Sequence, residues 1–181
     1  MKVDLSKYTN NEYDPGNKFK IVIWYIINHL IFNTFIPFPS FFKVKILKFF
    51  GAKIGKNIVI KPKVNIKYPW FLEIGDNCWI GEGVWIDNLA QITIGNNVCL
   101  SQNAYILAGS HNYKKEAFDL ILGKILLEDG VWIGAKSIVC PGVICKTHSV
   151  LTVGSVATND LEPYGVYQGN PAVLKRKRII E

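Results

Sequence analysis

The sequence predicts a parallel β-helix, a prism in which short strands from successive coils of chain lie above one another. Three observations support this fold class. From residue 54 onward an aliphatic side chain returns at every sixth position, a small or apolar residue follows four positions after each one, and turn sequences such as "IGDN", "IGEG" and "IGNN" stand between them. A helix requires a period of about 3.6 residues and a plain strand a period of 2, so a sustained period of six indicates a coil made of hexads.

The aliphatic positions of the repeat are expected to point into the prism, where each stacks on its equivalents in the coils above and below. They are Ile54, Ile60, Ile66, Ile74, Ile80, Ile86, Ile94, Leu100, Ile106, Leu127, Ile133, Val139, Cys145 and Leu151. The positions four residues later are Ile58, Val64, Trp70, Cys78, Val84, Ala90, Val98, Ala104, Ser110, Val131, Ser137, Val143, Ser149 and Ser155. Three hexads close one triangular coil, and neighbouring coils lie about 4.8 Å apart, the usual distance between strands.

The repeat is interrupted three times, always at the same corner of the triangle. Ile66 and Ile74 are eight residues apart, as are Ile86 and Ile94, and the third interval, from Ile106 to Leu127, is twenty-one residues long. The longest interval therefore predicts a loop, residues 107–126, that leaves one edge of the prism. Loops held by a rigid scaffold commonly carry function.

This predicted loop contains the motif "GSHNY" and with it His111. By register, Asp87 and Asn88 should lie one coil below the root of the loop. Histidine is the side chain best suited to act as a general base near neutral pH, and its place in the loop predicts a functional role for His111. His29 is expected to be a partly buried packing residue and His148 a surface residue. Asp87 and Asn88 are candidates to orient the imidazole or to bind substrate, although Asp and Asn are also common turn residues.

Composition limits the other possibilities. The chain has 181 residues, 49% of them hydrophobic and 19% charged, with a net charge of +7, which is not the composition of a disordered chain. A basic balance fits nucleic acid, an anionic membrane surface or phosphorylated ligands without choosing among them. The four cysteines form no C-x-x-C pair, so no zinc site is expected. The polar start of the chain does not resemble a secretory signal, so we expect a cytoplasmic protein with reduced thiols.

Residues 18–50 do not follow the period of six. The apolar run "KFKIVIWYIINHLIFNTFI" ends at "PFP", and "SFFKVKILKFFG" follows. The run is too short and too polar to favour a membrane span. It favours a helical cap over the open end of the prism. The alternative, compatible with the first, is a helix pair whose lysines meet anionic headgroups at a membrane surface. The predicted organisation is an N-terminal extension and cap (1–53), the β-helix (54–160) and a basic C-terminal tail (161–181).

Several segments resemble one family. "FGAKIGKNIVIKP", "YPWFLEIGDNCWIGEGVWIDNLA", "ITIGNNVCLSQNAYILAGSHNY", "EDGVWIGAKSIVCPGV" and "YGVYQGNPAVLKRKR" are similar to the hexapeptide-repeat acetyltransferases of the colanic-acid-biosynthesis type, over roughly residues 19 to 178. The resemblance implies a left-handed β-helix, a homotrimer with active sites between subunits, and transfer of an acetyl group from acetyl-CoA to a sugar hydroxyl in bacterial surface polysaccharide. The acceptor would be a precursor of capsule, exopolysaccharide or O-antigen. It assigns His111 the general-base role. We expect no metal and no nucleic-acid partner.

The donor site is predicted from outward aromatic residues and from the resemblance. Trp79, Trp85, Tyr105 and Trp132 each precede an inward residue, so strand alternation points them outward, and one prism face carrying them would suit subunit packing. The resemblance places Trp132, Ala135, Val153 and Thr158 beside the coenzyme. Lys175 and Arg176 in "LKRKR" suit its phosphates. Asn159 follows Thr158 where many family members have lysine, which puts one phosphate contact in doubt.

Other activities remain open at this stage. A zinc enzyme of the γ-carbonic-anhydrase type on the same fold would need three converging histidines, and the loop carries one. An N-acetyltransferase acting on an amino sugar and a purely structural β-helix are further alternatives, although a structural role would not require the loop. Cys78 and Cys145 are expected in the core and Cys99 and Cys140 have no histidine in register, so direct transfer without a covalent intermediate is favoured. The sequence does not identify the acceptor.

Overall fold

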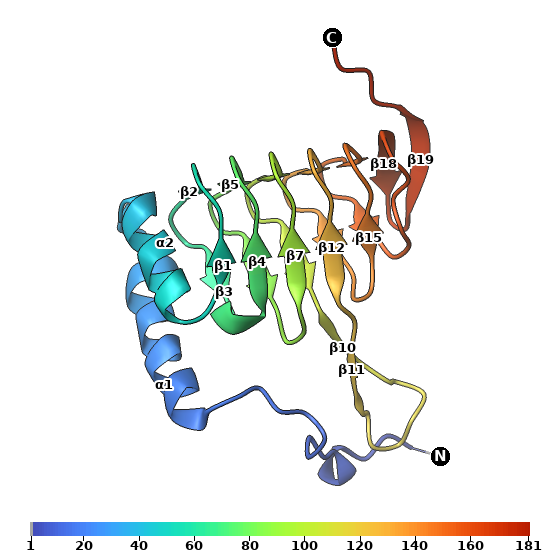
Figure 1. Ribbon diagram of the computed structural model, residues 1–181. Coiled ribbons are helices and arrows are strands. Elements are labelled where there is room, and N and C mark those ends of the chain that lie inside the picture. The colour runs from blue at the N-terminus through green and yellow to red at the C-terminus, as the bar shows by residue number, and fades with distance from the viewer. Residues whose placement is uncertain (1) are drawn as a thin grey trace.

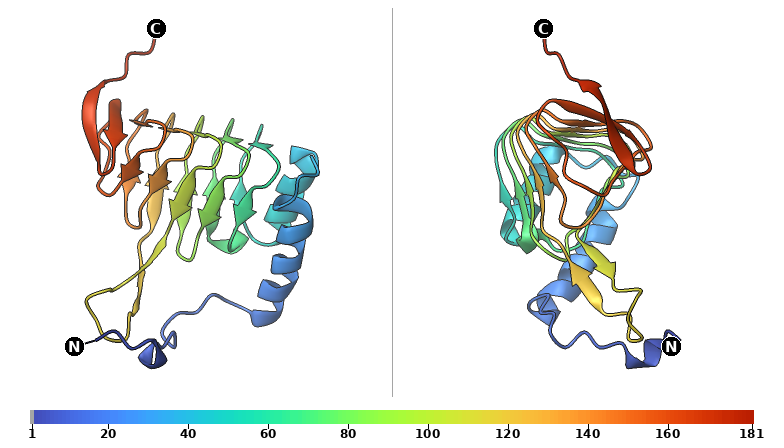
Figure 2. Two further views of the ribbon diagram at one scale, coloured as in Figure 1. Left: turned by 180° about the vertical axis from the view of Figure 1, so that it is seen from behind. Right: turned by 90° about the vertical axis from the view of Figure 1, so that its right-hand side faces the viewer.

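A computed structural model describes residues 2–181 of the chain. It is mainly β, a left-handed parallel β-helix of about six turns that is preceded by short helices. Figure 1 shows the coils side by side, with the helices at one end of the prism and a C-terminal hairpin at the other. The end-on view in Figure 2 shows the triangular outline of the coils and the hairpin that leaves one corner.

Each coil contributes one short strand to each of three faces. The first face has the order β1 (Lys53–Ile54), β4 (Leu72–Ile74), β7 (Ile92–Ile94), β12 (Ile125–Leu127), β15 (Ile144–Cys145). The second has the order β2 (Val59–Ile60), β5 (Trp79–Ile80), β8 (Cys99–Leu100), β13 (Trp132–Ile133), β16 (Val150–Leu151), β18 (Gly165–Gly169), β19 (Ala172–Lys177). The third has the order β3 (Asn65–Ile66), β6 (Trp85–Asp87), β9 (Tyr105–Leu107), β14 (Ile138–Val139), β17 (Val156–Ala157).

The aliphatic positions of the repeat stack as predicted. All fourteen are buried, and the register pairs them coil by coil, as in Ile54 with Ile74 and Ile74 with Ile94. Most positions four residues later are buried too. The exceptions are Trp70 and Ala90, which are half-buried, and Ser110, which is exposed. All three lie at the corner between the third and first faces (residues 67–71, 88–91 and 108–124). The extra residues at this corner carry the chain away from the core.

The turn residues form a ladder along another corner. A side-chain oxygen of Asp76 accepts a hydrogen bond from the backbone N–H of Lys56 at 2.7 Å, and Asn96 does the same for Asp76 at 2.8 Å. Asp129 continues the ladder by accepting from the Asn96 N–H at 2.7 Å. Each Asp or Asn therefore satisfies a backbone donor that the turn leaves free. These acidic residues are structural.

Two helices cover the open end of the first coil. α1 (Lys18–Ile27) continues as a π-helical turn (Asn28–Phe32), and α2 (Ser40–Phe49) begins after the Pro-x-Pro break. Trp24 is buried and donates its indole N–H to the carbonyl of Ile66 at 2.9 Å. Lys43 is fully buried and its ammonium donates to the carbonyl of Lys61 at 2.9 Å. These contacts satisfy backbone groups that an uncovered first coil would expose.

Among residues 2–181, neither helix is long and apolar enough to cross a membrane. His29, expected to be partly buried, is exposed on the cap, because the inward side of the π-helical turn is occupied by Asn28 and Phe32.

The segment predicted as a basic tail is folded differently. β18 continues the second face by pairing in parallel with β16, and β19 returns antiparallel to β18. Lys175 and Arg176 therefore lie on a strand of this hairpin, exposed at the C-terminal end of the prism. The charges of these residues are held in a defined place because the hairpin extends a hydrogen-bonded sheet.

The outward aromatic residues do not share one face, contrary to expectation. Trp79 and Trp132 project from the second face, where Cys99 lies between them in register. Trp85 and Tyr105 are paired on the third face, with ring centroids 6.0 Å apart. The distribution follows from the hexad, since two successive hexads occupy two different faces. All four side chains are exposed, as predicted.

Candidate active site

The long loop is a β-hairpin with a fixed base. β10 (Gly109–His111) and β11 (Leu120–Leu122) pair antiparallel, with His111 opposite Leu120. At the base, the Ala108 N–H donates to the carbonyl of Asp87 at 3.1 Å, and the Gly123 N–H donates to the carbonyl of Ala108 at 2.9 Å. The hairpin is thus anchored to the coil below, as the register of the repeat predicts. His111 projects from a strand instead of a flexible loop.

The imidazole of His111 is held on two sides. Its Nδ1 lies 2.9 Å from the backbone carbonyl oxygen of Phe118, and the Phe118 ring stacks on it with centroids 4.5 Å apart and planes 9° apart. The ring of Tyr8 lies near the imidazole, with ring centroids 5.7 Å apart. A carbonyl oxygen can only accept, so Nδ1 carries the proton and donates it. In the neutral ring Nε2 is then the unprotonated nitrogen, which is the form a general base requires.

An N-terminal strap, residues 2–17, runs along this hairpin. The Asp4 N–H donates to the carbonyl of Glu116 at 2.9 Å, and the Lys7 ammonium forms an ion pair with the Glu116 carboxylate at 2.8 Å. Nearer the prism, the Tyr13 hydroxyl donates to the carbonyl of Leu89 at 2.8 Å. Figures 1 and 2 show the strap passing close to the hairpin tip in all views. Sequence reasoning missed it, because its residues have no period and contact the hairpin about a hundred positions away.

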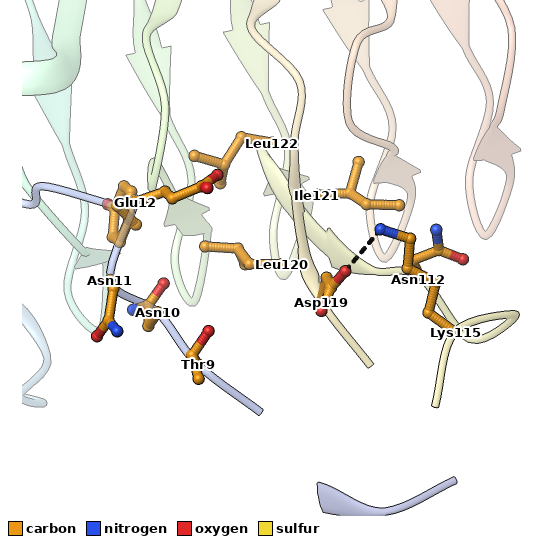
Figure 3. Close-up of a pocket in the computed structure, with 11 residues that line it drawn as sticks. Thr9, Asn10, Asn11, Glu12, Asn112, Lys115, Asp119, Leu120, Ile121 and Leu122 are labelled. Atoms are coloured by element: carbon orange, nitrogen blue, oxygen red, sulfur yellow. Dashed lines mark hydrogen bonds and ion pairs between the residues drawn. The ribbon is translucent and has the colours of Figure 1, made fainter. Parts of the chain in front are cut away.

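A cleft of about 710 Å³ lies between the strap and the hairpin. Its wall is formed by Thr9, Asn10, Asn11, Glu12 and Tyr13 from the strap and by Asn112, Lys115, Asp119, Leu120, Ile121 and Leu122 from the hairpin. Figure 3 shows the amide, hydroxyl and carboxylate groups of both segments around it, with Lys115 and Asp119 paired to each other at 2.9 Å. Asn112, the residue after His111, lines this cleft, as does Leu120, which pairs with His111 across the hairpin; His111 itself does not line it. Such a wall offers both donors and acceptors to a polyhydroxylated ligand.

Asp87 and Asn88 have different surroundings. Asn88 is fully buried, and its side-chain amide bonds both the N–H and the carbonyl of Tyr68 in the coil below. Asp87 is half-buried, with a carboxylate oxygen 3.9 Å from the Lys67 ammonium. The pKa of the Tyr68 hydroxyl is raised, mainly by burial and to a lesser degree by the negative charge of Asp87. Within residues 2–181 neither side chain bonds His111, whose ring is oriented by the Phe118 carbonyl instead.

The structure separates the residues predicted to bind the coenzyme. Ala135 and Val153 lie together at the corner between the second and third faces, where the Gly154 N–H donates to the Ala135 carbonyl at 2.9 Å. Trp132 projects from the adjoining second face and donates its indole N–H to the Ser101 hydroxyl at 2.9 Å. Thr158 lies on the other side of the third face, beyond β17. The third face therefore lies between Thr158 on one side and Ala135, Val153 and Trp132 on the other. The basic strand β19 lies apart from them, at the C-terminal end of the second face.

The cysteines are poor nucleophiles in this fold. Cys78 and Cys145 are buried in the core, as predicted, while Cys99 and Cys140 are half-buried. Burial raises the pKa of all four thiols, which disfavours the reactive thiolate. Among residues 2–181, no three His, Cys, Asp or Glu side chains are grouped so that they could hold a metal ion. His148, the remaining histidine, stacks on Tyr164 with centroids 4.9 Å apart.

Comparisons with known proteins agree with this fold. No protein-family model matches the chain. A protein of Escherichia coli K12 named as the colanic acid biosynthesis acetyltransferase WcaF is 35% identical over 164 residues, 91% of this chain and 90% of its own. The galactoside O-acetyltransferase of Lactococcus lactis is 31% identical over 75% of this chain and 67% of its own.

Solved structures also share the architecture. A hexapeptide-repeat acetyltransferase of Vibrio cholerae, solved with acetyl-CoA, superposes with a TM-score of 0.77 at 22% identity, over 90% of this chain and 87% of its own. A maltose O-acetyltransferase of Clostridium difficile superposes with a TM-score of 0.78 at 22% identity, over 91% of this chain and 90% of its own. At such identities the likeness establishes the fold. The identity to WcaF over nearly the whole of both chains establishes the family: this chain belongs to the hexapeptide-repeat acetyltransferases of the colanic acid biosynthesis type, and it is an acyltransferase.

Proposed function

We propose that the protein transfers an acetyl group from acetyl-CoA directly to a sugar hydroxyl during the synthesis of a bacterial surface polysaccharide, with His111 as the general base. The observation that carries the proposal is the hydrogen bond from His111 Nδ1 to the Phe118 carbonyl at 2.9 Å. It leaves Nε2 as the basic nitrogen on a hairpin that is anchored to a rigid prism. The names of the relatives support the reaction class, since they include acetyltransferases of galactoside and of colanic acid biosynthesis.

The transfer needs only one residue that exchanges a proton. Nε2 of His111 accepts the proton of the acceptor hydroxyl as its oxygen bonds to the thioester carbonyl carbon. The carbon–sulfur bond then breaks, and the imidazolium returns the proton to the leaving thiolate, which departs as the free thiol of coenzyme A. The ring stays in place during both steps because the Phe118 carbonyl and ring hold it. Backbone fixation of the second nitrogen is the usual way to define which nitrogen reacts.

The alternative with an acetylated cysteine has less support. Two thiols are sealed in the core, and burial raises the pKa of the other two. A nucleophilic thiol normally sits in a partly exposed, electropositive place that lowers its pKa. Direct transfer is therefore the mechanism we propose.

The cleft between strap and hairpin is the acceptor site in this proposal. Its amides, hydroxyl and carboxylates suit the donor and acceptor pattern of sugar hydroxyls. Asp87, half-buried at the root of the same hairpin, remains our candidate for a further substrate contact. Asn88 was predicted alongside it, but its amide is already used by the Tyr68 backbone, so we keep the substrate role for Asp87 alone.

The donor and the assembly are also proposals. Half-buried Ala135 and exposed Val153 at one corner of the third face, exposed Thr158 at another, and Trp132 would hold the coenzyme. Lys175 and Arg176 would meet its phosphates. Exposed aromatic side chains on two faces of a narrow prism favour subunit packing, so we propose a homotrimer with active sites between subunits. The cytoplasmic location inferred from the sequence stays a prediction.

One experiment tests the reaction and its chemistry together. Purified protein is incubated with acetyl-CoA and a panel of bacterial glycan precursors, including amino sugars, and the products are analysed by mass spectrometry before and after mild alkali. We expect an acetylated product whose acetyl group alkali removes, since an ester is hydrolysed and an amide is not. An alkali-stable product would instead make the protein an N-acetyltransferase of an amino sugar. No acetylated product from any precursor would contradict the proposed substrate class.

A further inference from the structure

The outer surface of the cap is apolar where a soluble helix pair would be polar. On α1 the exposed side chains recur at the spacing of one helix face, opposite buried Trp24, and include Phe19, which is 74% exposed. On α2 they include Phe49, which is 85% exposed. We call this surface the cap face; it comprises Phe19, Val22, Ile26, Leu30, Phe41 and Phe49. Both helices lie over the same end of the prism (Figures 1 and 2). The side chains of the cap face are exposed, whereas Trp24 and Lys43 on the same helices are buried against the first coil.

The basic charge of the protein is concentrated around this surface. Residues 15–72, which contain the cap and the first coil, hold ten lysines and no Asp or Glu. The remaining residues hold 11 Lys and Arg against 14 Asp and Glu, so the net charge of +7 comes entirely from the cap end. Lys18, Lys45 and Lys48 are exposed on the two helices. The Lys45 ammonium lies 5.9 Å from the centroid of the Phe41 ring, so charge and apolar surface are interleaved.

Apolar rings interleaved with lysines match one kind of partner. An anionic phospholipid surface presents an acyl boundary for the rings and negative headgroups for the ammonium groups, and such binding scales with both. A second copy of the chain fits poorly, because two cap faces would bring like charges together. We propose that the cap face docks the protein on an anionic phospholipid bilayer without spanning it. The helices are then both the lid of the prism and its membrane contact, which unites the two interpretations that the sequence left open.

The proposal predicts a binding equilibrium that depends on salt and on two kinds of side chain. Each lysine near an anionic surface contributes about fivefold to the partition coefficient, and salt weakens this term by screening. In flotation with phosphatidylcholine vesicles that contain phosphatidylglycerol, we expect the protein to float at low salt and to be released at high salt. Vesicles of phosphatidylcholine alone should bind it much less. The variant Lys45→Glu/Lys48→Glu should lower partitioning about 30-fold or more, and Phe41→Ser/Phe49→Ser should abolish flotation.

Matched controls separate this surface from general effects. Ile179→Ser removes an apolar side chain that is also 85% exposed but lies at the other end of the chain, and Lys136→Glu reverses an exposed charge on a later coil. Both should float like the unaltered protein. All changed side chains are exposed, and thermal unfolding confirms that each variant is folded. Absence of flotation on anionic vesicles at low salt overturns the proposal. Equal flotation of the cap variants and the controls also overturns it. If the cap variants have a lower particle mass in solution and the unaltered protein does not bind vesicles, the cap face is a contact between copies of the chain instead.

Discussion

Replacement of His111 by alanine tests the proposed chemistry most directly. The change removes Nε2, the nitrogen that the Phe118 carbonyl leaves unprotonated, and with it the general base. A general base contributes about 10²- to 10⁴-fold, which corresponds to about 3 to 5 kcal/mol of the activation free energy. The fold should persist, because the imidazole is half-buried on a hairpin outside the core and its replacement leaves the fourteen inward positions untouched.

The assay compares kcat with saturating acetyl-CoA and acceptor, alongside thermal unfolding. His148→Ala is the matched control, since this ring is also half-buried and stacked on an aromatic side chain, Tyr164, but belongs to a coil turn. We expect kcat to fall by about 10²-fold or more in His111→Ala and to be unchanged in His148→Ala, with both proteins folded. His111→Asn should be as inactive as alanine, because its amide can still donate to the Phe118 carbonyl but cannot accept the proton. Near-normal turnover of His111→Ala refutes the assignment of the base.

Four further variants test other parts of the structure. Asn88→Ala should lower the free energy of unfolding by about 1 to 3 kcal/mol in urea titration, because two partly buried backbone groups of Tyr68 in the coil below lose their partner. Trp132→Ala, and separately Lys175→Ala/Arg176→Ala, should raise the KM for acetyl-CoA and leave kcat largely intact, as expected for lost uniform binding. Burial lowers the pKa of Lys43 from its ordinary value of 10.5. Between the lowered folded pKa and 10.5 the unfolded chain binds more protons, so the free energy of unfolding should rise with pH there. Lys43→Met should lose this rise.

Each of these expectations has a control. Gln102→Ala, at an exposed turn position, should not change stability; unaltered stability of Asn88→Ala with a raised acceptor KM would make Asn88 a substrate ligand. Trp79→Ala removes the other exposed indole of the second face and should leave the KM for acetyl-CoA unchanged. Unchanged coenzyme affinity in calorimetry for both donor-site variants would contradict the placement of that site. For Lys43→Met, the same alkaline rise as in the unaltered protein would show that another group causes it.

The repeat determined most of the fold from sequence alone. Each inward position faces the same local requirement, an aliphatic side chain that stacks on its equivalents one coil away, so the period is legible without knowledge of distant contacts. The interruptions of the period also placed the loop and, by register, Asp87 beside its root. The choice of His111 followed from chemistry and position together. Handedness did not follow from the period, because a hexad repeat read along the chain is the same for either hand.

Only the tertiary structure decided the surroundings of the candidate base. The strap contacts the hairpin through pairs such as Lys7 with Glu116, which are 109 positions apart in the sequence. No periodic signal links segments that are so distant. The tautomer of His111 depends on where the Phe118 carbonyl points, which is set by a hairpin turn with Phe118 at φ 53°. Lys43 reads in the sequence as a surface charge, yet it is buried because the uncovered carbonyls of the first coil need donors. Repetition makes local requirements visible in a sequence, whereas contacts made once between distant segments become visible only when the chain is folded.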